Sequence, residues 1–150
     1  MTYFNKNKEL KRGYNAYIDE STNYMGTLMN VGLLVMEDGD TYTYESAARE
    51  VAILLFEGKV TYEYAGKTVE ADRPNCFHHE AYCLLAPKGT KITLTAHSHS
   101  ELYMQDTLNE KDYEPEYESE FEEQCKVIYK SLRENVIGTI HGDIKAAKRR

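Results

Sequence analysis

Short hydrophobic runs separated by turn residues fill the middle of the 150-residue chain, from Val31 to Asp106. Within 59–64 and again within 91–96, apolar and polar residues alternate, which is typical of half-buried β-strands. Glycine or proline stands in the intervening segments, where the backbone must reverse. We expect these turns at 37–40, 57–59, 65–67 and 87–90. The pattern predicts an all-β sandwich or barrel.

The run Val51–Phe56, VAILLF, is apolar throughout and does not alternate. A continuous apolar run of this length is typical of a strand that is covered on both faces. The second cover would be another element of the chain or another subunit. We therefore expect a homodimer that forms through the barrel face.

The last third of the chain changes its period. After Pro115, apolar residues recur at steps of four, four, three and four, which predicts an amphipathic α-helix. Glutamates crowd the start of this segment and basic residues its end, as the helix dipole favours. The expected organisation is a flexible N-terminal segment at 1–13, a barrel at 14–108, an acidic linker and amphipathic helix at 109–134, and a basic tail at 135–150.

Charge and hydropathy limit the kinds of molecule that we expect the chain to bind. The chain has 25 Asp and Glu against 18 Lys and Arg, so its formal net charge is −7. An acidic chain repels phosphate, and we expect no nucleic-acid partner. The longest apolar run falls far short of the roughly 20 residues that a membrane span needs, and the polar N-terminus offers no signal-peptide stretch. We expect no membrane partner and a cytoplasmic location.

Two longer segments carry a resemblance to a known family: AAREVAILLFEGKVTYEY, and then ADRPNCFHHEAYCLLAPKGTKITLTAHSHSELYM. Over about residues 14–106 the chain resembles the N-terminal cupin half of the 5-deoxy-glucuronate isomerase and 4-deoxy-5-threo-hexosulose-uronate isomerase family. The matching positions are Arg49, Glu50, Gly58, Arg73, Phe77, Tyr82, Pro87 and Gly89. The resemblance implies a single cupin, a double-stranded β-helix or jelly-roll barrel, followed here by the C-terminal α-helix.

The family resemblance also implies an activity and a metal. Its members are sugar-acid aldose–ketose isomerases of inositol or uronate breakdown, which move a proton between adjacent carbons and usually polarise the carbonyl with a metal. They are bicupins with the metal site in the second cupin, and this chain stops where that half would begin. Metal-binding cupins place ligands where this sequence has Glu45, Ser46 and Ile92. We predict no cofactor, with divalent zinc or manganese as the alternative.

The adjacent pair Arg49 and Glu50 supplies the first candidate site residues. Neighbours on a strand face opposite sides, so only one of them points into the barrel. An inward Glu50 is a candidate general base, whereas an inward Arg49 is a candidate clamp for a substrate carboxylate. The alternative is an Arg–Glu ion pair at a sheet edge or subunit interface. Further candidate substrate-binding residues, which could equally be turn or core residues, are Arg73, Tyr62, Tyr82 and Tyr103.

Histidines form the second group of candidates. His97 and His99 would project to the same side of an extended segment, as two imidazoles must to reach one metal. His78, His79 or Glu101 would be the third ligand. The alternative is an exposed hairpin loop whose histidines are solvated.

Two functional hypotheses follow. In the first, the chain is an isomerase-family cupin that binds a small sugar acid and uses Glu50 as its base. In the second, it is a non-catalytic cupin module that binds a small sugar acid or pairs with another chain. Whether the chain catalyses a reaction by itself is left open by the sequence.

Overall fold

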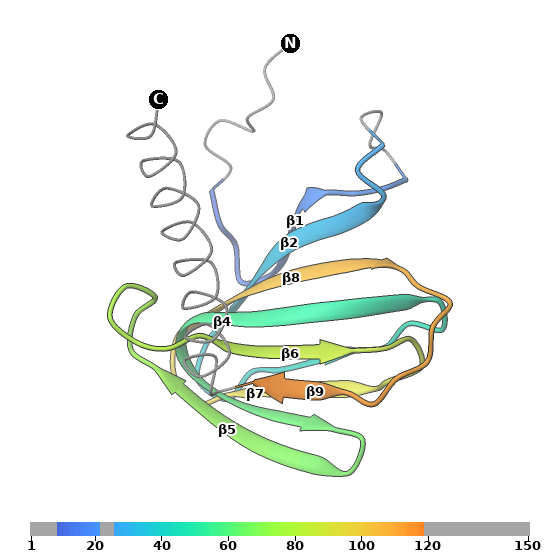
Figure 1. Ribbon diagram of the computed structural model, residues 1–150. Helices are drawn as coiled ribbons and strands as arrows, with labels where there is room; N and C mark the ends of the chain where they lie inside the picture. The colour runs from blue at the N-terminus through green and yellow to red at the C-terminus, as the bar shows by residue number, and fades with distance from the viewer. Residues whose placement is uncertain (1–8, 22–25, 119–150) are drawn as a thin grey trace, which may run out of the picture. The chain divides into compact units, whose positions relative to one another are not determined.

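Nine β-strands make up the part of the chain that the computed structural model describes, residues 9–21 and 26–118 (Figure 1). The strands are β1 (Gly13–Ile18), β2 (Met29–Met36), β3 (Thr41–Tyr44), β4 (Arg49–Tyr64), β5 (Lys67–Arg73), β6 (Tyr82–Ala86), β7 (Ile92–Ala96), β8 (Ser100–Leu108) and β9 (Glu116–Glu118). All their pairings are antiparallel. These described residues contain no helix, and the predicted all-β fold is confirmed.

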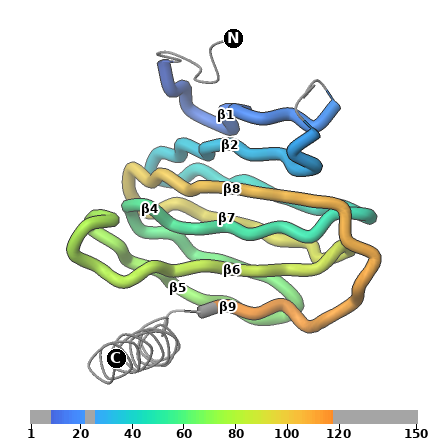
Figure 2. Tube along the Cα trace, turned by 45° about the horizontal axis from the view of Figure 1, so that its top comes forward, coloured from blue at the N-terminus to red at the C-terminus, as the bar shows by residue number. Residues whose placement is uncertain are grey.

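The strands form two sheets that share β4. The first sheet runs β1-β2-β8-β4-β6-β9, and its strands follow one another down the front of Figure 2. In the second sheet β3 pairs with β7, and β4 pairs with both β7 and β5. The first half of β4 pairs with β8 and β6, and its second half with β5 and β7. Because β4 passes from one sheet to the other, the two sheets face each other, and the core lies between them.

The apolar run in β4 alternates in burial although it does not alternate in polarity. Val51, Ile53 and Leu55 are at most 1% exposed and belong to the core. The intervening residues 52, 54 and 56 are partly exposed. One face of this strand therefore packs on the core, and the other face is half-buried within a single chain. A homodimer through the half-buried face stays a prediction.

Three of the four predicted turns join consecutive strands, but the prediction of a turn at 57–59 is wrong. Residues 57–59 lie within β4, which continues as one strand to Tyr64. A register shift between Leu55 and Glu57 bends the strand, and Gly58 has a φ of 112°. Glycine adopts such an angle without the strain that a Cβ would cause. The glycine therefore bends the chain into the second sheet and does not reverse it.

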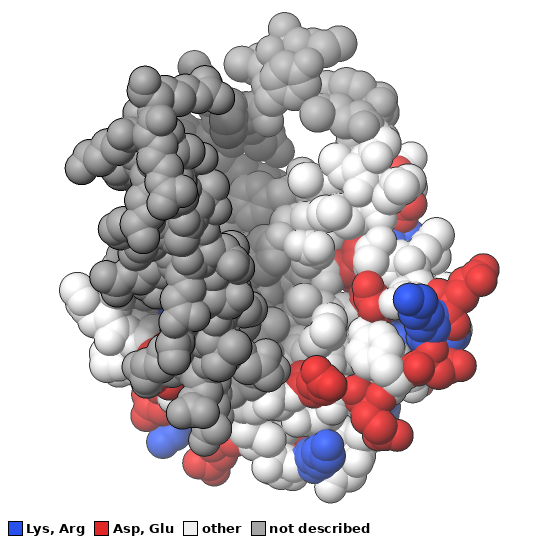
Figure 3. All heavy atoms as spheres, viewed as in Figure 1, with Lys and Arg blue, Asp and Glu red and all other residues white. Residues whose placement is uncertain are grey.

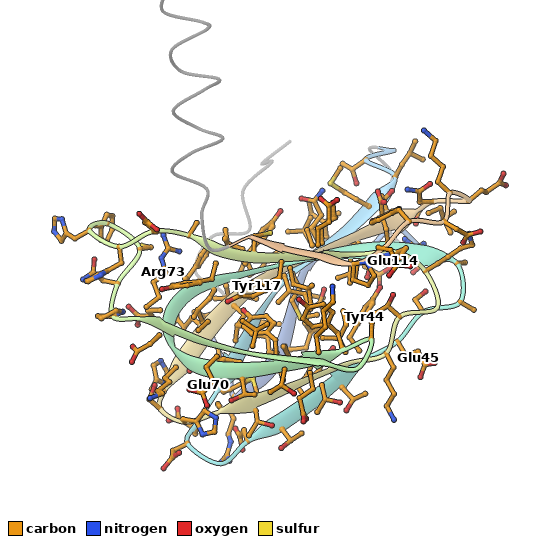
Figure 4. The ribbon with its side chains drawn as sticks, turned by 60° about the horizontal axis from the view of Figure 1, so that its bottom comes forward. Tyr44, Glu45, Glu70, Arg73, Glu114 and Tyr117 are labelled. Atoms are coloured by element: carbon orange, nitrogen blue, oxygen red, sulfur yellow. The ribbon has the colours of Figure 1, made fainter. Side chains whose placement is uncertain are left out.

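Tyrosine rings fill much of the space between the sheets. Tyr62 is fully buried, and its ring meets that of Tyr117 edge to face, with centroids 5.4 Å apart. Figure 4 shows Tyr117 and Tyr44 between the two layers of strands. No described residue gives the hydroxyl of Tyr62 a hydrogen-bond partner. The buried ring of Tyr62 stabilises the core. Burial also removes water from its hydroxyl, and no hydrogen bond to a described residue replaces that water.

We expect the Tyr62→Phe variant to be more stable than the wild type by about 1 kcal/mol, because it removes a buried, unpaired hydroxyl. Urea unfolding followed by circular dichroism measures this difference. The matched control is Tyr103→Phe, because the Tyr103 hydroxyl donates to Gln105 Oε1 at 2.8 Å and its loss gives no such gain. A loss of stability on replacing Tyr62 would show that its hydroxyl is hydrogen-bonded in solution.

The segment that begins the predicted C-terminal helix is a strand as far as it is described. Glu116–Glu118 forms β9, which pairs with the open edge of β6, and Pro115 just before it is buried. Tyr117 packs on the core, so tertiary contacts outweigh the helical period at these three residues. The rest of the predicted helix and the basic tail at 135–150 lie outside the described residues, and the strands belong to one unit that ends at Ser119.

The surface carries both signs of charge. On the face that Figure 3 shows, acidic and basic side chains lie intermixed toward the right and the lower edge. At the N-terminal side, Arg12 Nε donates to Asp40 Oδ2 at 2.8 Å, so the end of the predicted flexible segment is tied to the β2–β3 turn. A helix long and apolar enough to cross a membrane is not found among residues 9–21 and 26–118.

Candidate functional site

A pocket of about 230 Å³ opens between the two sheets. Its walls come from β1, β2 and β8 of the first sheet and from β3 of the second. The polar lining residues are Tyr14, Asp19, Asn30, Tyr42, Tyr44 and Asp106, and the apolar ones are Ala16, Ile18 and Met104. We call this cavity the inter-sheet pocket. Its mixture of aromatic rings and a few convergent polar groups is typical of small-molecule sites.

Asp106 is the carboxylate that β8 brings to this pocket. Asn30 Nδ2 donates to its Oδ1 at 2.8 Å, and an Arg49 guanidinium nitrogen lies 3.1 Å from the same oxygen. Arg49 also pairs with Glu20, so its guanidinium joins two carboxylates. The Tyr44 hydroxyl also lies close enough to interact with this carboxylate through a hydrogen bond. The geometry thus fixes Asp106 at Oδ1 by contacts with Asn30 and Arg49.

Three tyrosines bring hydroxyl groups to the pocket. Burial raises the pKa of Tyr14 to about 12, and it also raises the pKa of Tyr42. Burial, and then the negative charge of Asp106, raises the pKa of Tyr44 further above its ordinary value. The Tyr44 hydroxyl is buried, and a hydrogen bond with Asp106 adds to the rise in its pKa. All three phenols stay protonated at neutral pH and can donate a hydrogen bond to a ligand.

Gly32 in β2 makes room for one of these rings. A Cβ at this position would lie 2.4 Å from Cζ of Tyr14. Gly32 pairs with Ala16 of β1 on one side and with Met104 of β8 on the other, and both of these line the pocket. The missing side chain therefore lets the phenol of Tyr14 lie over β2 at the pocket.

The structure separates the adjacent candidates Arg49 and Glu50. The Arg49 side chain reaches Asp106 at the inter-sheet pocket. Glu50 Oε2 accepts hydrogen bonds from the side chains of Asn109 and Tyr113 instead, the latter at 2.9 Å. Glu50 does not line the pocket, whereas Asp106 does. Asp106 therefore lies at the pocket and Glu50 does not, while a catalytic role for Glu50 stays a prediction.

Asp106 was missed by the sequence reasoning although the sequence carries a signal for it. Leu102, Met104 and Asp106 follow one another at every second residue of β8. The first two are buried apolar residues of the core, and the third carries a charge on the same face of the strand. A carboxylate in register with core residues is a mark of a site residue, because burying a charge without a function or a partner is costly.

The other predicted substrate-binding residues are not brought to the pocket. Tyr62 is a core residue, and Tyr82 packs near Tyr117, with ring centroids 6.5 Å apart. Tyr103 stacks on Phe56, with centroids 6.0 Å apart, on the half-buried face of β4. None of these three tyrosines lines the inter-sheet pocket.

Arg73 is a buried arginine that ties the 74–81 loop to the barrel. Its guanidinium donates to the backbone carbonyls of Leu55 at 2.5 Å, Cys76 at 3.3 Å and His79 at 3.2 Å. Figure 4 shows Arg73 at the end of the barrel away from Tyr44. These hydrogen bonds to three backbone carbonyls compensate the burial of the Arg73 charge, so no sugar ligand is needed to explain it.

The predicted His-x-His pair does not converge on one point. Residues 97–99 form a bend, and the rule for extended strands therefore fails there. His97 Nε2 lies 2.7 Å from Thr61 Oγ1, while His99 Nδ1 lies 2.9 Å from Glu37 Oε1. His78 is exposed in the 74–81 loop. The predicted trio of His97, His99 and His78 is not brought together by any contact of the described residues.

His99 nevertheless lies in a group with metal-ligating atoms. One ligand atom each from Glu57, His99 and Glu101 lies within 4.8 Å of the others. Glu57 and Glu101 face each other across β4 and β8, where like charges repel. When it is protonated, His99 is a positive partner for these carboxylates. Its hydrogen bond with Glu37, and then the charges of Glu37, Glu101 and Glu57, raise the pKa of His99 above its ordinary value.

We expect the His99 titration midpoint to lie above its ordinary value of about 6.5 and to fall in the Glu37→Gln variant. Because the pKa of His99 is raised on folding, its ion pair with Glu37 stabilises the protein fully below about pH 6.5 and is lost as pH rises through the raised pKa. NMR titration of the imidazole protons measures the midpoint. Glu45→Gln, an exposed glutamate, is the control, and an unchanged midpoint in Glu37→Gln would contradict the assignment.

A histidine-bound divalent metal, which cupins of this kind commonly carry, does not fit the inter-sheet pocket. The described lining provides the two carboxylates of Asp19 and Asp106 but no imidazole and no thiolate. Zinc and manganese sites in proteins are usually completed by histidine. The chemistry of this pocket is therefore derived from its carboxylates and phenols alone.

Comparisons with known proteins agree with the cupin fold. The model of the KduI/IolB family matches residues 3–129, and no curated protein sequence matches the chain. An IolB-like protein from Salmonella typhimurium LT2 superposes with a TM-score of 0.65 at 19% identity. The superposition covers 72% of this chain and 42% of that protein. The chain thus spans less than half the length of this solved relative.

More distant structures share the fold alone. The cupin domain of Schizosaccharomyces pombe Cnp3 superposes with a TM-score of 0.50 at 12% identity, over 64% of each chain. A variant of salicylate 1,2-dioxygenase from Pseudoaminobacter salicylatoxidans gives 0.50 at 13% identity, over 62% of this chain and 25% of the enzyme. The described strands therefore form a cupin barrel, as the sequence predicted.

Proposed function

The chain belongs to the KduI/IolB family, and from this premise we propose that it acts on a sugar by isomerase-type chemistry in the inter-sheet pocket. The observation that carries the proposal is Asp106, a carboxylate held at Oδ1 by Asn30 and Arg49 beside three protonated phenols. Aromatic rings and planar polar side chains suit a sugar, which has apolar faces and hydroxyl edges. We also propose that the substrate is a sugar acid of inositol or uronate breakdown.

The reaction needs a base and a hydrogen-bond donor. Asp106 Oδ2 takes the proton from the carbon next to the sugar carbonyl, and the electron pair of that C–H bond forms the double bond of an enediol. The Tyr44 hydroxyl donates to the carbonyl oxygen as negative charge develops there, and it relays one proton between the two sugar oxygens. Asp106 then delivers its proton to the former carbonyl carbon. The proton balance closes without a further co-reactant.

The second candidate function is a non-catalytic cupin module that binds a sugar or sugar acid. The donor set of the pocket favours it, because the described lining lacks the histidines with which a metal-dependent isomerase would polarise its substrate. Binding by the carboxylate and phenols would be the same in both candidates. Proton transfer from a substrate carbon distinguishes them.

The test uses the full chain with 5-deoxy-D-glucuronate in D2O. Calorimetry measures binding, and proton NMR follows both the ketose product and the exchange of the substrate C–H for deuterium. We expect binding, exchange and product, and we expect the same rate after dialysis against EDTA. Binding with neither exchange nor product would favour the non-catalytic module. Failure to bind any sugar would contradict both candidates.

A further inference from the structure

Two glutamates face each other across neighbouring strands where β4 bends. Glu57 of β4 pairs with Glu101 of β8, so both side chains lie on the same side of the sheet. Glu101 stands between the buried residues Ser100 and Leu102, and its side chain therefore points out of the barrel core. No lysine or arginine among the described residues forms an ion pair with Glu57 or Glu101. A cation bound between the two carboxylates would relieve their repulsion.

The imidazole of His99 adds a nitrogen ligand to this pair of carboxylates. Its Nδ1 lies 2.9 Å from Glu37 Oε1, and because an ionised carboxylate only accepts, Nδ1 carries the hydrogen of this bond. In the neutral imidazole the free lone pair is then on Nε2, which lies 3.8 Å from Glu101 Oε1. A carboxylate that holds the far nitrogen is the common outer partner of a metal-bound histidine. The contact with Glu37 therefore presents Nε2 to a metal beside Glu101.

The spacing of these ligand atoms and the space beside them fit one small metal ion. One atom each from Glu57, His99 and Glu101 lies within 4.8 Å of the other two. A zinc ion bonded to two ligands at about 2.1 Å joins atoms up to about 4.2 Å apart, so a small rotation of the glutamate side chains closes the set. A cavity of about 360 Å³ opens beside them, with Glu57 and His99 in its lining. The cavity leaves room for the water that completes an open zinc site.

We propose that Glu57, His99 and Glu101 bind one zinc ion on the outer face of the barrel, with water as the fourth ligand. The two carboxylate charges balance the charge of the ion. Glu37 is a positioning residue, because it holds the imidazole without touching the metal. Magnesium and calcium bind more weakly here, since they prefer oxygen ligands and the imidazole supplies a nitrogen.

This zinc site is separate from the inter-sheet pocket. The two share no lining or ligand residue among those described. Gly58, next to Glu57, pairs with Arg73, which Figure 4 shows at the end of the barrel away from Tyr44. The proposed ligands also differ from the positions at which metal-binding cupins place theirs. The zinc site therefore stands or falls independently of the proposed function.

The experiment titrates zinc chloride into the tag-free full chain, stripped of metal with EDTA and then freed of EDTA, and follows binding by calorimetry. We expect one equivalent to bind, and binding at least tenfold weaker in His99→Gln and in Glu101→Gln. Glu37→Gln is expected to weaken binding about tenfold, as loss of an outer partner does. The matched control is His97→Gln, which removes a neighbouring exposed histidine whose Nε2 lies 2.7 Å from Thr61 Oγ1, and it is expected to leave the affinity unchanged.

Nitrogen NMR of the wild-type chain locates the ion without any variant. We expect zinc to shift the Nε2 resonance of His99 and to leave His97 unchanged. Absence of zinc binding would overturn the proposal, and so would shifts at His97 or His78 in place of His99. Binding that none of the variants weakens would show an adventitious ion only and would also overturn it, as would equally tight binding of magnesium. None of these measurements uses a sugar, so their failure is distinct from failure of the proposed function.

Discussion

Replacing Gly58 by alanine is expected to lower the free energy of unfolding by about 3 kcal/mol, the sum of backbone strain and overpacking. A Cβ at this position would lie 2.2 Å from Ser100 Oγ and 2.6 Å from the backbone oxygen of His99. The φ of Gly58 is 112°, which an alanine adopts only under strain. Because the obstacle includes backbone atoms of the neighbouring strand, a change of rotamer cannot relieve it.

The matched control for this variant is Gly39→Ala. Gly39 also has a positive φ, of 83°, but a Cβ added there would have no atom of the described residues within 4 Å beyond its chain neighbours. The control therefore isolates backbone strain, for which we expect a loss of about 1 kcal/mol. Urea unfolding of both variants gives the two values. Equal losses at Gly58 and Gly39 would show that β4 does not approach β8 as closely at its bend as described.

The Asp106→Asn variant is expected to lose at least about a hundredfold in kcat, because an amide cannot take up the substrate proton. Asparagine has the shape of aspartate and can still accept at Oδ1 from Asn30 and Arg49, so the fold is expected to persist. The effect should fall on kcat more than on KM, since the amide still contributes hydrogen bonds to a bound sugar. Proton NMR of deuterium exchange and product formation measures it.

Two controls accompany the Asp106 variant. Asp38→Asn removes a carboxylate outside the pocket and is expected to leave kcat unchanged. Glu50→Gln tests the base that the sequence suggested, and we expect little effect, because Glu50 is engaged by Asn109 and Tyr113 away from the pocket. Loss of exchange in Glu50→Gln with full exchange in Asp106→Asn would reverse the assignment of the base.

Much of the fold could be predicted because local patterns determine it. The period of two in Ile92–Ala96 and the turn residues at 37–40 and 87–90 correspond to strands and connections of the structure. The exceptions are decided by contacts between distant segments. Gly58 bends β4 into the second sheet because of its approach to Ser100, and Glu116–Glu118 is a strand because the edge of β6 is open.

The pocket could not be predicted to the same degree, because its residues are far apart in the sequence. Asn30 and Asp106 are separated by 76 residues, and Arg49 and Asp106 by 57. Spacing rules apply only within a strand or helix, so they cannot bring such residues together. For His97 and His99 a bend replaces the extended backbone that a shared metal would need, and both side chains are exposed, as the alternative of a hairpin loop predicted.

A crystal structure of the sugar complex would show whether a sugar binds in the inter-sheet pocket against Asp106. Crystals would be grown at a sugar concentration that saturates the site by calorimetry. We predict ordered sugar between the sheets, with one hydroxyl within hydrogen-bond distance of Asp106 Oδ2 and another beside the Tyr44 hydroxyl. Sugar ordered elsewhere, for example at the corner of Glu57, His99 and Glu101, with only solvent in the inter-sheet pocket, would show that this pocket is not the sugar site.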